Sequence, residues 1–368
     1  MELKIKREDF LKALYWTQST VERRNTMPIL ANVLIEAHGG SIRVTATDLE
    51  IGVRAKLEGE ILQEGMVTLN AKKLYEIVRE AAEEAVYLRR LENEWVEVKS
   101  GKSVFKMVGL DAREFPAFPD FGSENLIPIP AMVLKEMIDK TAFSVSTDES
   151  RSTLNGAFLE EGGGGKLRMV ATDGHRLASI ERGVSSLGLE KGVILPRKGL
   201  SELRKLLEDV EEGVVSLGFK GNMGLVARDN VELFMRLIEG DYPDYGKVIP
   251  KDNPLRVKVE QRGLLRALRR VLILSSERYR GIKVEFRQGN MMISASNPDL
   301  GEVVEEVEIE YEGKPLTVGF NARYLMDMLG VLGDDADVGV ELKDELSPSL
   351  LRRDGDDEYI YVIMPMRL

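Results

Sequence analysis

The stretch VATDGHRLA, Val170–Ala178, belongs to one of three related segments in this chain of 368 residues. The other two are VTATDLEIGVRA, Val44–Ala55, and ISASNPDLGEVV, Ile293–Val304. Each alternates apolar and polar residues around a turn at Asp or Asn, which is the pattern of strands joined by a turn. Because the segments recur about every 120 to 125 residues, they predict three copies of one domain rather than a solenoid.

Each repeat carries the same blocks in the same order around its segment. A helical pattern precedes the segment, and a short apolar strand that leads into a second helical pattern follows it. Two helices and about eight strands per repeat predict an α+β fold, in which helices lie on antiparallel sheets. The expected boundaries of the three domains are 1–125, 126–249 and 250–368.

The composition is that of an ordinary globular protein without covalent or metal cross-links. Cysteine is absent, which excludes disulfides and thiolate metal sites. The N-terminus, MELKIKRED, lacks the apolar core of a signal peptide, and no window is apolar over the length of a membrane span. We therefore expect a cytoplasmic protein with no metal, no cofactor and no membrane partner.

Charge is distributed unevenly along the chain. The formal net charge of −11 argues against a general nucleic-acid binder, but the predicted helices carry more Lys and Arg than Asp and Glu. Basic residues seven apart, or at i, i+4 and i+8, share one helix face. Such faces recur in corresponding helices, which indicates a surface for phosphates. Their members are Lys72 with Arg79, Arg197 with Arg204, Lys198 with Lys205, and Arg262, Arg266 and Arg270.

Asp173 and His175 allow a different interpretation, that of an acid–base pair in a metabolic enzyme. Residues two apart in a strand or turn need not converge, and no cysteine or obvious nucleophile stands near them. The enzyme therefore stays the alternative, and we expect no catalytic residue. The basic helix faces also argue against a third interpretation, a purely structural scaffold that does not bind DNA.

Four short motifs occur in order along the repeats: Thr47–Glu50, Ala171–Ala178, Pro196–Gly199 and the terminal Met364–Leu368. Together they resemble the bacterial sliding clamp family, the β subunit of DNA polymerase III. The resemblance implies three clamp domains per chain and a head-to-tail homodimer that closes into a ring, with helices inside and sheets outside. It implies a non-catalytic processivity factor that encircles duplex DNA without sequence specificity.

The resemblance and the basic helix faces together suggest which residues contact DNA. The resemblance points to Arg24, Lys72, Arg197 and Lys198, and to a segment near residue 152, where this chain lacks the aromatic residues of many family members. The full set of expected DNA contacts is Arg24, Lys72, Arg79, Arg151, Ser152, Thr153, Arg197, Lys198, Arg204, Lys205, Arg266 and Arg270.

In the family, short peptide motifs of partner proteins dock in an apolar pocket between the second and third domains. Leu, Val, Ile and Met side chains make an adaptable pocket for a Leu or Phe side chain, and Arg176 and Arg367 would orient polar parts of the peptide. The pocket residues implied by the resemblance are Leu154, Thr172, Gly174, His175, Arg176, Leu177, Pro243, Lys247, Val248, Pro348, Val362, Ile363, Met364, Pro365, Met366, Arg367 and Leu368.

Ring closure would join the first domain of one chain to the third domain of the other. An apolar centre with charges of opposite sign suits such a joint. The implied interface residues are Lys73, Lys102, Phe105 and Lys106 on one side and Ile273, Leu274, Glu302, Glu305 and Glu306 on the other. The implied partners are double-stranded DNA, a second copy of the chain, the polymerase III catalytic subunit, the clamp loader complex, and other polymerases, ligase and mismatch-repair proteins.

Overall fold

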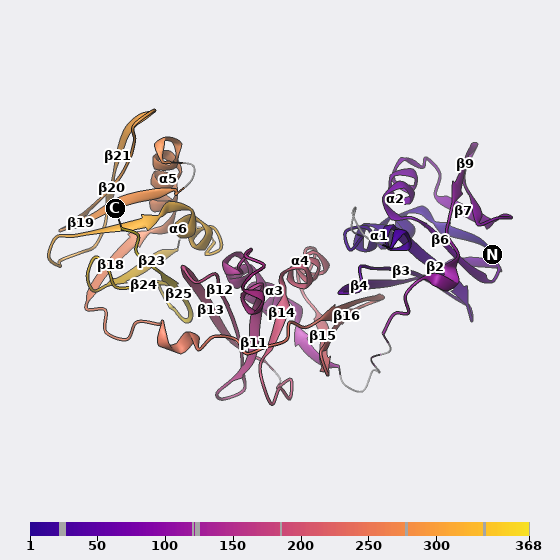
Figure 1. The fold of residues 1–368 in the computed structure, drawn as a ribbon, viewed down its shortest axis with the longest axis horizontal. Coiled ribbons are helices and arrows are strands. Elements are labelled where there is room, and N and C mark those ends of the chain that lie inside the picture. Colours follow the sequence, from indigo (N-terminus) through magenta and orange to yellow (C-terminus); the bar gives the residue numbers. More distant parts are fainter. Residues whose placement is uncertain are drawn as a thin grey trace. The chain divides into compact units, whose positions relative to one another are not determined.

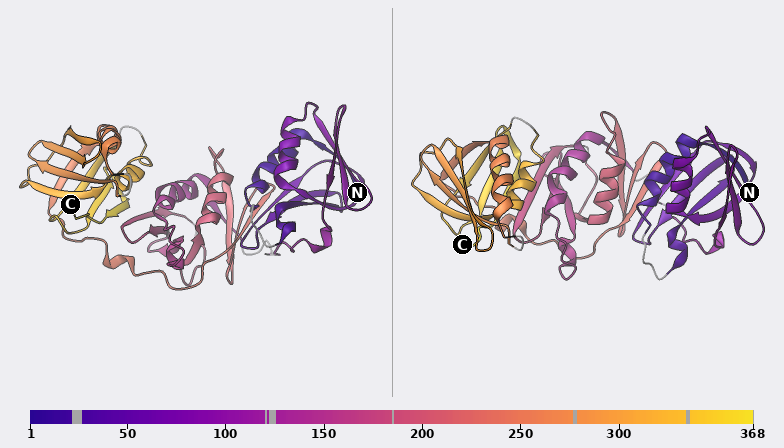
Figure 2. Two further views of the ribbon diagram at one scale, coloured as in Figure 1. Left: turned by 45° about the horizontal axis from the view of Figure 1, so that its top comes forward. Right: turned by 90° about the horizontal axis from the view of Figure 1, so that it is seen from above.

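The computed structural model describes residues 1–21, 27–119, 121, 126–184, 186–276, 279–333 and 336–367. The chain divides into two compact units, which are drawn in Figures 1 and 2. Unit 1 consists of Met1–Met132 and Lys198–Leu237, and unit 2 consists of Val133–Arg197 and Ile238–Leu368. Each unit therefore combines two stretches that are far apart in the sequence.

Six α-helices occur in the described residues. Apolar side chains at helical spacing line one face of each, as Leu264, Ala267, Leu268 and Val271 do in the third repeat. Two helices begin at an asparagine whose side chain accepts a hydrogen bond from the first turn, Asn70 from Lys73 N and Asn321 from Arg323 N. The helices are α1 Arg7–Gln18, α2 Ala71–Glu80, α3 Ala131–Thr141, α4 Arg197–Leu206, α5 Gln261–Val271 and α6 Ala322–Leu329.

Unit 1 contains two antiparallel sheets. The smaller has the strand order β5-β1-β7-β8-β9 and the larger has the order β10-β15-β16-β17-β4-β3-β2-β6. Their strands are β1 Glu2–Lys6, β2 Asn32–His38, β3 Ser41–Thr47, β4 Ile51–Leu57, β5 Glu60–Gln63, β6 Gly65–Asn70, β7 Ala85–Arg90, β8 Trp95–Ser100, β9 Ser103–Val108, β10 Ile127–Pro130, β15 Val214–Lys220, β16 Met223–Arg228 and β17 Val231–Arg236.

Unit 2 also contains two antiparallel sheets. The larger has the order β14-β11-β12-β13-β25-β24-β23-β18 and the smaller has the order β21-β20-β19-β22. Their strands are β11 Gly156–Gly162, β12 Lys166–Thr172, β13 Arg176–Gly183, β14 Val193–Pro196, β18 Leu255–Glu260, β19 Gly281–Arg287, β20 Asn290–Asn297, β21 Gly301–Glu308, β22 Leu316–Asn321, β23 Asp337–Leu342, β24 Ser349–Arg353 and β25 Asp356–Ile363.

The two eight-stranded sheets run across the repeats of the sequence. In unit 1, β4 of the first repeat pairs with β17 of the second, with Gly52 opposite Phe234. In unit 2, β13 of the second repeat pairs with β25 of the third, with Leu177 opposite Val362. The compact units therefore do not follow the repeats, and the boundaries expected from the sequence stay a prediction.

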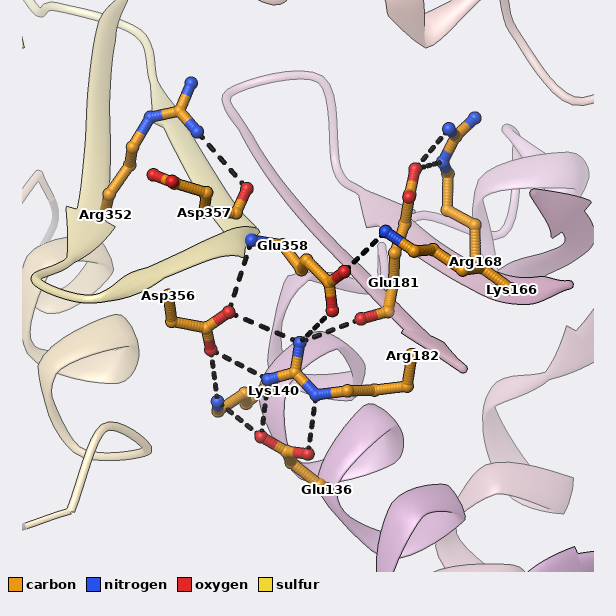
Figure 3. Close-up of polar contacts among 10 residues, drawn as sticks. All are labelled: Glu136, Lys140, Lys166, Arg168, Glu181, Arg182, Arg352, Asp356, Asp357 and Glu358. Carbon is orange, nitrogen blue, oxygen red and sulfur yellow. Dashed lines mark hydrogen bonds and ion pairs between the residues drawn. The ribbon is translucent and has the colours of Figure 1, made fainter. Parts of the chain in front are cut away.

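Ion pairs reinforce the second of these strand pairings (Figure 3). The Arg182 guanidinium donates to both Glu136 oxygens, at 2.9 and 2.7 Å, and to Asp356 at 2.7 Å. Lys140, which is almost fully buried, donates to the same Glu136 at 2.6 Å. Burial opposes ionisation of Glu136 and Asp356, but hydrogen bonds from the two cations outweigh it and lower the pKa of both carboxyl groups.

The helices pack on the sheets, as the predicted α+β fold requires. In unit 1, α1 lies beside α2 and contacts β3 and β4, and in unit 2, α5 lies beside α6 and contacts β20 and β21 (Figure 1). The cores are apolar, with Phe10, Leu14 and Leu74 fully buried under the helices of unit 1. Strand β9 ends the smaller sheet of unit 1, and strand β21 ends the smaller sheet of unit 2.

Candidate functional site

Exposed basic side chains stand on the helix faces opposite the core. Lys72 and Arg79 on α2, Arg197 and Arg204 on α4, and Arg266 on α5 are all exposed. Lys72 lies 4.0 Å from Glu76, and Arg79 lies 3.0 Å from Glu80, both at the protein surface. Exposed pairs of this kind are weak, so these cations can also reach phosphate oxygens.

Lys198 and Lys205 share a face of α4 as predicted, but that face is turned towards α1. Lys198 Nζ is bound to the buried carboxylate of Asp48 and donates to the Thr20 carbonyl at 3.3 Å. Lys205 Nζ donates to the Tyr15 carbonyl and lies 4.1 Å above the Tyr15 ring, and burial lowers its pKa. Both ammonium groups therefore connect α4 to the first repeat, and the expectation that they contact DNA stays a prediction.

Arg270 on α5 is paired with Glu305 on β21. Its guanidinium binds both carboxylate oxygens of Glu305, at 2.7 and 2.6 Å. This pair raises the pKa of Arg270 and lowers that of Glu305. The roles expected of the two residues, a DNA contact for Arg270 and an interface contact for Glu305, stay predictions.

The segment near residue 152 lies beside the predicted pocket. Ser152 and Thr153 belong to a single 3₁₀ turn, and Arg151 lies 3.0 Å from Asp148. The Arg151 guanidinium also lies against Gly174, where an added Cβ would come within 2.8 Å of it. Arg151 is therefore close to both predicted sites, whereas Arg24 lies outside the described residues.

The turn Asp173–Arg176 forms one wall of the pocket. The Asp173 side chain accepts hydrogen bonds from the backbone nitrogens of His175 and Arg176, at 2.9 and 3.1 Å, and Gly174 adopts φ +88°. This geometry needs Asp at the start of the turn and Gly at the strained position. Since the Asp173 carboxylate serves the turn and Arg176, it is not placed as a base for His175, whose side chain is exposed.

The Arg176 side chain is held in place by hydrogen bonds to protein groups. Its guanidinium donates to Asp173 at 3.1 Å, to Asp327 at 2.7 Å and to the Phe143 carbonyl at 2.6 Å. It also lies 4.3 Å from the centre of the Tyr324 ring, and its side chain is only 9% exposed. These protein groups bind the Arg176 guanidinium within the chain, and the expectation that it orients the peptide stays a prediction.

A buried apolar cluster lies beneath the proposed pocket, with Leu177 and Val362 directly opposite each other on β13 and β25. Val170 and Leu350 complete the buried cluster. The rings of Phe158, Tyr242 and Tyr245 and the side chains of Ile249 and Ile360 pack against it. These three aromatic residues were not predicted from the sequence as part of the site. For Tyr242 and Tyr245, the signal is the Tyr-Pro-Asp-Tyr motif, which places two large rings around an exposed proline.

The remaining predicted pocket residues lie around this cluster or behind it. Met364 is exposed and its backbone nitrogen donates to the His175 carbonyl at 2.9 Å, so the tail is fixed to the turn. Lys247 lies 3.0 Å from Asp244, and Val248 is exposed beside it. Leu154, Thr172, Ile363, Pro365 and Met366 are buried or half-buried supports, Pro243 and Arg367 are exposed, Pro348 is half-buried, and Leu368 lies outside the described residues.

The terminal strands β9 and β21 carry exposed apolar side chains and charges of opposite sign. On β9, Val108 is 62% exposed, Phe105 is exposed and Lys106 follows it, with Lys102 in the preceding turn. On β21, Val304 is 59% exposed between Glu302 and Glu306. Ile273, in the turn after α5, is 74% exposed, whereas Leu274 is half-buried and Lys73 is paired with Glu76 at 2.8 Å. Exposed edges of this kind are templates for pairing with another chain.

The described ranges contain neither a cluster of metal ligands nor a membrane-spanning helix. No three His, Asp or Glu side chains gather there in a geometry that could hold a metal ion. No α-helix in that part of the chain combines the length and apolar character that crossing a bilayer requires.

Antiparallel sheets covered by helix pairs, repeated three times in the sequence, define a DNA-clamp fold. Family models of the DNA polymerase III beta subunit match the chain from end to end: the N-terminal domain at residues 1–119, the central domain at 128–244 and the C-terminal domain at 246–367. The chain belongs to this family, the bacterial beta sliding clamps.

This chain is similar to known sliding clamps over the whole length of both chains. The beta sliding clamp of Caulobacter vibrioides is 37% identical over 376 residues, and that of Pseudomonas aeruginosa is 37% identical over 372, each with 100% of both chains covered. A solved DnaN sliding clamp from Bartonella birtlesii, bound to griselimycin, has a TM-score of 0.95 at 34% identity, again with 100% of both chains covered.

The family assignment decides between the interpretations of the sequence. The chain has the function of a sliding clamp in DNA replication, a non-catalytic processivity factor of DNA polymerase III, with DNA and that polymerase as partners and a dimeric assembly. The alternative, an enzyme using Asp173 and His175, is wrong, in agreement with the structural use of the Asp173 carboxylate.

Proposed function

We propose that two copies of this chain close head to tail into a ring around duplex DNA. The observation that carries the proposal is the complementarity of strands β9 and β21, each of which ends its sheet. Strand β9 offers Val104, Phe105 and Val108 beside Lys102 and Lys106, and strand β21 offers Val304 between acidic residues. Pairing of the edges would satisfy their backbone groups, bury the apolar side chains and bring opposite charges together. Since Glu305 is bound by Arg270, the charge pairs across the joint would come from Glu302 and Glu306.

The DNA contacts proposed are the exposed basic side chains of the helices. Lys72, Arg79, Arg197, Arg204 and Arg266 would meet phosphates, which carry no sequence information. Contacts of this kind are salt-dependent and individually weak, so the ring can slide. Retention on DNA would come from closure of the ring, and the acidic remainder of the chain would disfavour binding of DNA to the outside.

The pocket is proposed to hold short motifs of partner proteins. The Leu177–Val362 pair and the exposed Met364, Pro243 and Val248 would receive a Leu or Phe side chain. The partners proposed are the polymerase III catalytic subunit, the clamp loader complex, other polymerases, ligase and mismatch-repair proteins. The site of action proposed is the cytoplasm, on the nucleoid during replication.

The test of the ring is its topology on DNA. The protein would be loaded on nicked circular DNA with a clamp loader and ATP, and the circle would then be cut with a restriction enzyme. We expect the protein to leave when the DNA becomes linear, because a ring slides off a free end. Retention after cutting, or no loading on the circle, would contradict the proposal.

A further inference from the structure

The rim of the proposed pocket is carried by a linker, residues 239–254, which two tyrosines fasten to the sheet of the second repeat. The Tyr242 ring stacks on Phe158 with centroids 5.0 Å apart, and its hydroxyl accepts a hydrogen bond from Thr172 N at 3.1 Å. The Tyr245 hydroxyl accepts a hydrogen bond from Arg168 Nη1 at 2.8 Å and donates to Glu160 Oε1.

The groups that bind Tyr245 form a row of charges across three strands. Glu160 on β11 is opposite Arg168 on β12, which is opposite Glu181 on β13. The Arg168 guanidinium binds both carboxylates, and all three side chains are between 24% and 30% exposed. We call these three residues the charge row. Burial and the hydrogen bond to Glu160 raise the pKa of Tyr245 to about 12, so its hydroxyl stays protonated as a donor at neutral pH.

Tyr245 is connected directly to the rim. It begins the 3₁₀ turn Tyr245–Lys247, and Val248 N donates to the Tyr245 carbonyl at 3.1 Å. The exposed Pro243 lies between the two tyrosines in the sequence. Displacement of the Tyr245 ring would therefore move the rim residues on both sides of it.

The first repeat is an internal comparison, because its strands pair in the same register. The positions of the charge row are Glu36, Arg43 and Lys56, so the third residue is a cation instead of a carboxylate. The linker there carries Phe115 and Phe118 where the second carries Tyr242 and Tyr245. Neither phenylalanine has a hydroxyl, and Glu36 and Arg43 line an open cavity of about 280 Å³.

In the first repeat, the Phe118 ring of the linker lies over the strand pair β4–β17. Gly52 and Phe234 are opposite each other on β4 and β17, as Leu177 and Val362 are on β13 and β25. The Phe118 ring is 6.2 Å from the Phe234 ring, and an added Cβ at Gly52 would come within 3.1 Å of it. Linker rings pack over the strand pair in both repeats, and the second repeat adds hydrogen bonds at the hydroxyls of Tyr242 and Tyr245.

We propose that Tyr245 is a positioning residue, whose hydroxyl is held by the charge row so that the linker keeps Pro243 and Val248 in place at the rim of the proposed pocket. The inference rests on the proposed peptide pocket and adds to it the anchor that holds its rim. Tyr245 itself need not touch the peptide.

The test compares peptide affinities of Tyr245→Phe and unaltered protein, with a fluorescein-labelled synthetic peptide that carries Leu and Phe side chains. We expect the Kd to rise roughly three- to ten-fold, the effect of losing one ordinary hydrogen bond, since this bond positions the linker and does not itself touch the peptide. The matched control is Tyr311→Phe, since the Tyr311 hydroxyl also donates to a protein oxygen, the Lys314 carbonyl at 2.6 Å, and Tyr311 is not part of the pocket cluster. The control should leave the Kd unchanged.

A double-mutant cycle separates positioning from a general loss of stability. Arg168→Met should weaken peptide binding by itself, and it should weaken it little further in the presence of Tyr245→Phe, because both changes remove the same anchor. Additive effects, or a Tyr245→Phe protein that binds as tightly as the unaltered one, would overturn the inference. If the unaltered protein does not bind the peptide, the proposed pocket fails instead.

Discussion

Arg176 shows how one side chain can stabilise a site through contacts within its own chain. We expect Arg176→Met to lower the free energy of unfolding by about 3 kcal/mol, because it leaves the Asp173 carboxylate without its cation and leaves Asp327 with the exposed Arg323. Thermal denaturation measures the loss. The control is Arg323→Met, since Arg323 pairs with the same Asp327 but is 58% exposed, and it should change stability by less than about 1 kcal/mol. Equal losses would contradict the argument.

Met364 is an exposed apolar residue of the proposed pocket. Met364→Ala should raise the Kd for a partner peptide roughly ten-fold, because a packed apolar side chain contributes about 1 to 2 kcal/mol. Met132→Ala is the control, since Met132 is also a largely exposed methionine, in α3, and it should not affect binding. Fluorescence anisotropy distinguishes them, and an unaltered Kd for Met364→Ala would remove this residue from the pocket.

Individual contacts were the part of the site that sequence patterns could predict least. The spacing of Lys198 and Lys205 correctly placed them on one face of α4, but spacing does not say what lies opposite that face. The partners, Asp48 and Tyr15, are about 150 or more residues away in the sequence. Tyr242 and Tyr245 were missed for the same reason, because their hydroxyls bind groups on distant strands.

At the scale of elements, helix α4 allows a test of the proposed DNA face. Replacing Arg197 and Arg204 with Gln should reduce the salt dependence of DNA retention, by a slope of about one for each phosphate contact removed. Lys198→Met is the control from the same helix. It should lower stability, because Asp48 loses its partner, without altering the salt slope. Identical slopes for all three proteins would remove α4 from the DNA face.

The terminal strands β9 and β21 allow a sharper test of dimerisation. Changing Lys102 and Lys106 to Glu, or Glu302 and Glu306 to Lys, should produce monomers, because each change places like charges across both joints of the ring. An equimolar mixture of the two variants should form dimers again, since every joint then has one basic and one acidic edge. Sedimentation velocity measures both results. Dimers of either variant alone, or monomers in the mixture, would refute the assignment.

The fold was more predictable than the site at this scale. Alternation and helical periodicity correctly indicated helices on antiparallel sheets, because these patterns report which face of an element is buried. They could not show that β4 pairs with β17 or β13 with β25. Pairing between strands that are far apart in the sequence depends on tertiary contacts. The sequence pattern of an apolar strand is the same whether its neighbour is local or distant.

At the scale of the whole molecule, the ion pairs around Arg182 link stability to pH. The pKa values of Glu136 and Asp356 are lowered in the folded protein, so their contribution is present above the ordinary carboxyl pKa of about 4 and is lost as the pH falls below it. Arg182→Met should therefore flatten the decline of stability in this acid range. Urea denaturation at a series of pH values measures it, and parallel curves for the two proteins would contradict the prediction.

The strand pairings across repeats also have a consequence for synthesis on the ribosome. Strand β4 leaves the ribosome about 170 residues before its partner β17, and β13 precedes β25 by about the same length. At 5 to 20 residues per second, each strand waits roughly 10 to 35 s with an open edge. A nascent chain therefore cannot complete its first large sheet until most of the second repeat has emerged from the ribosome.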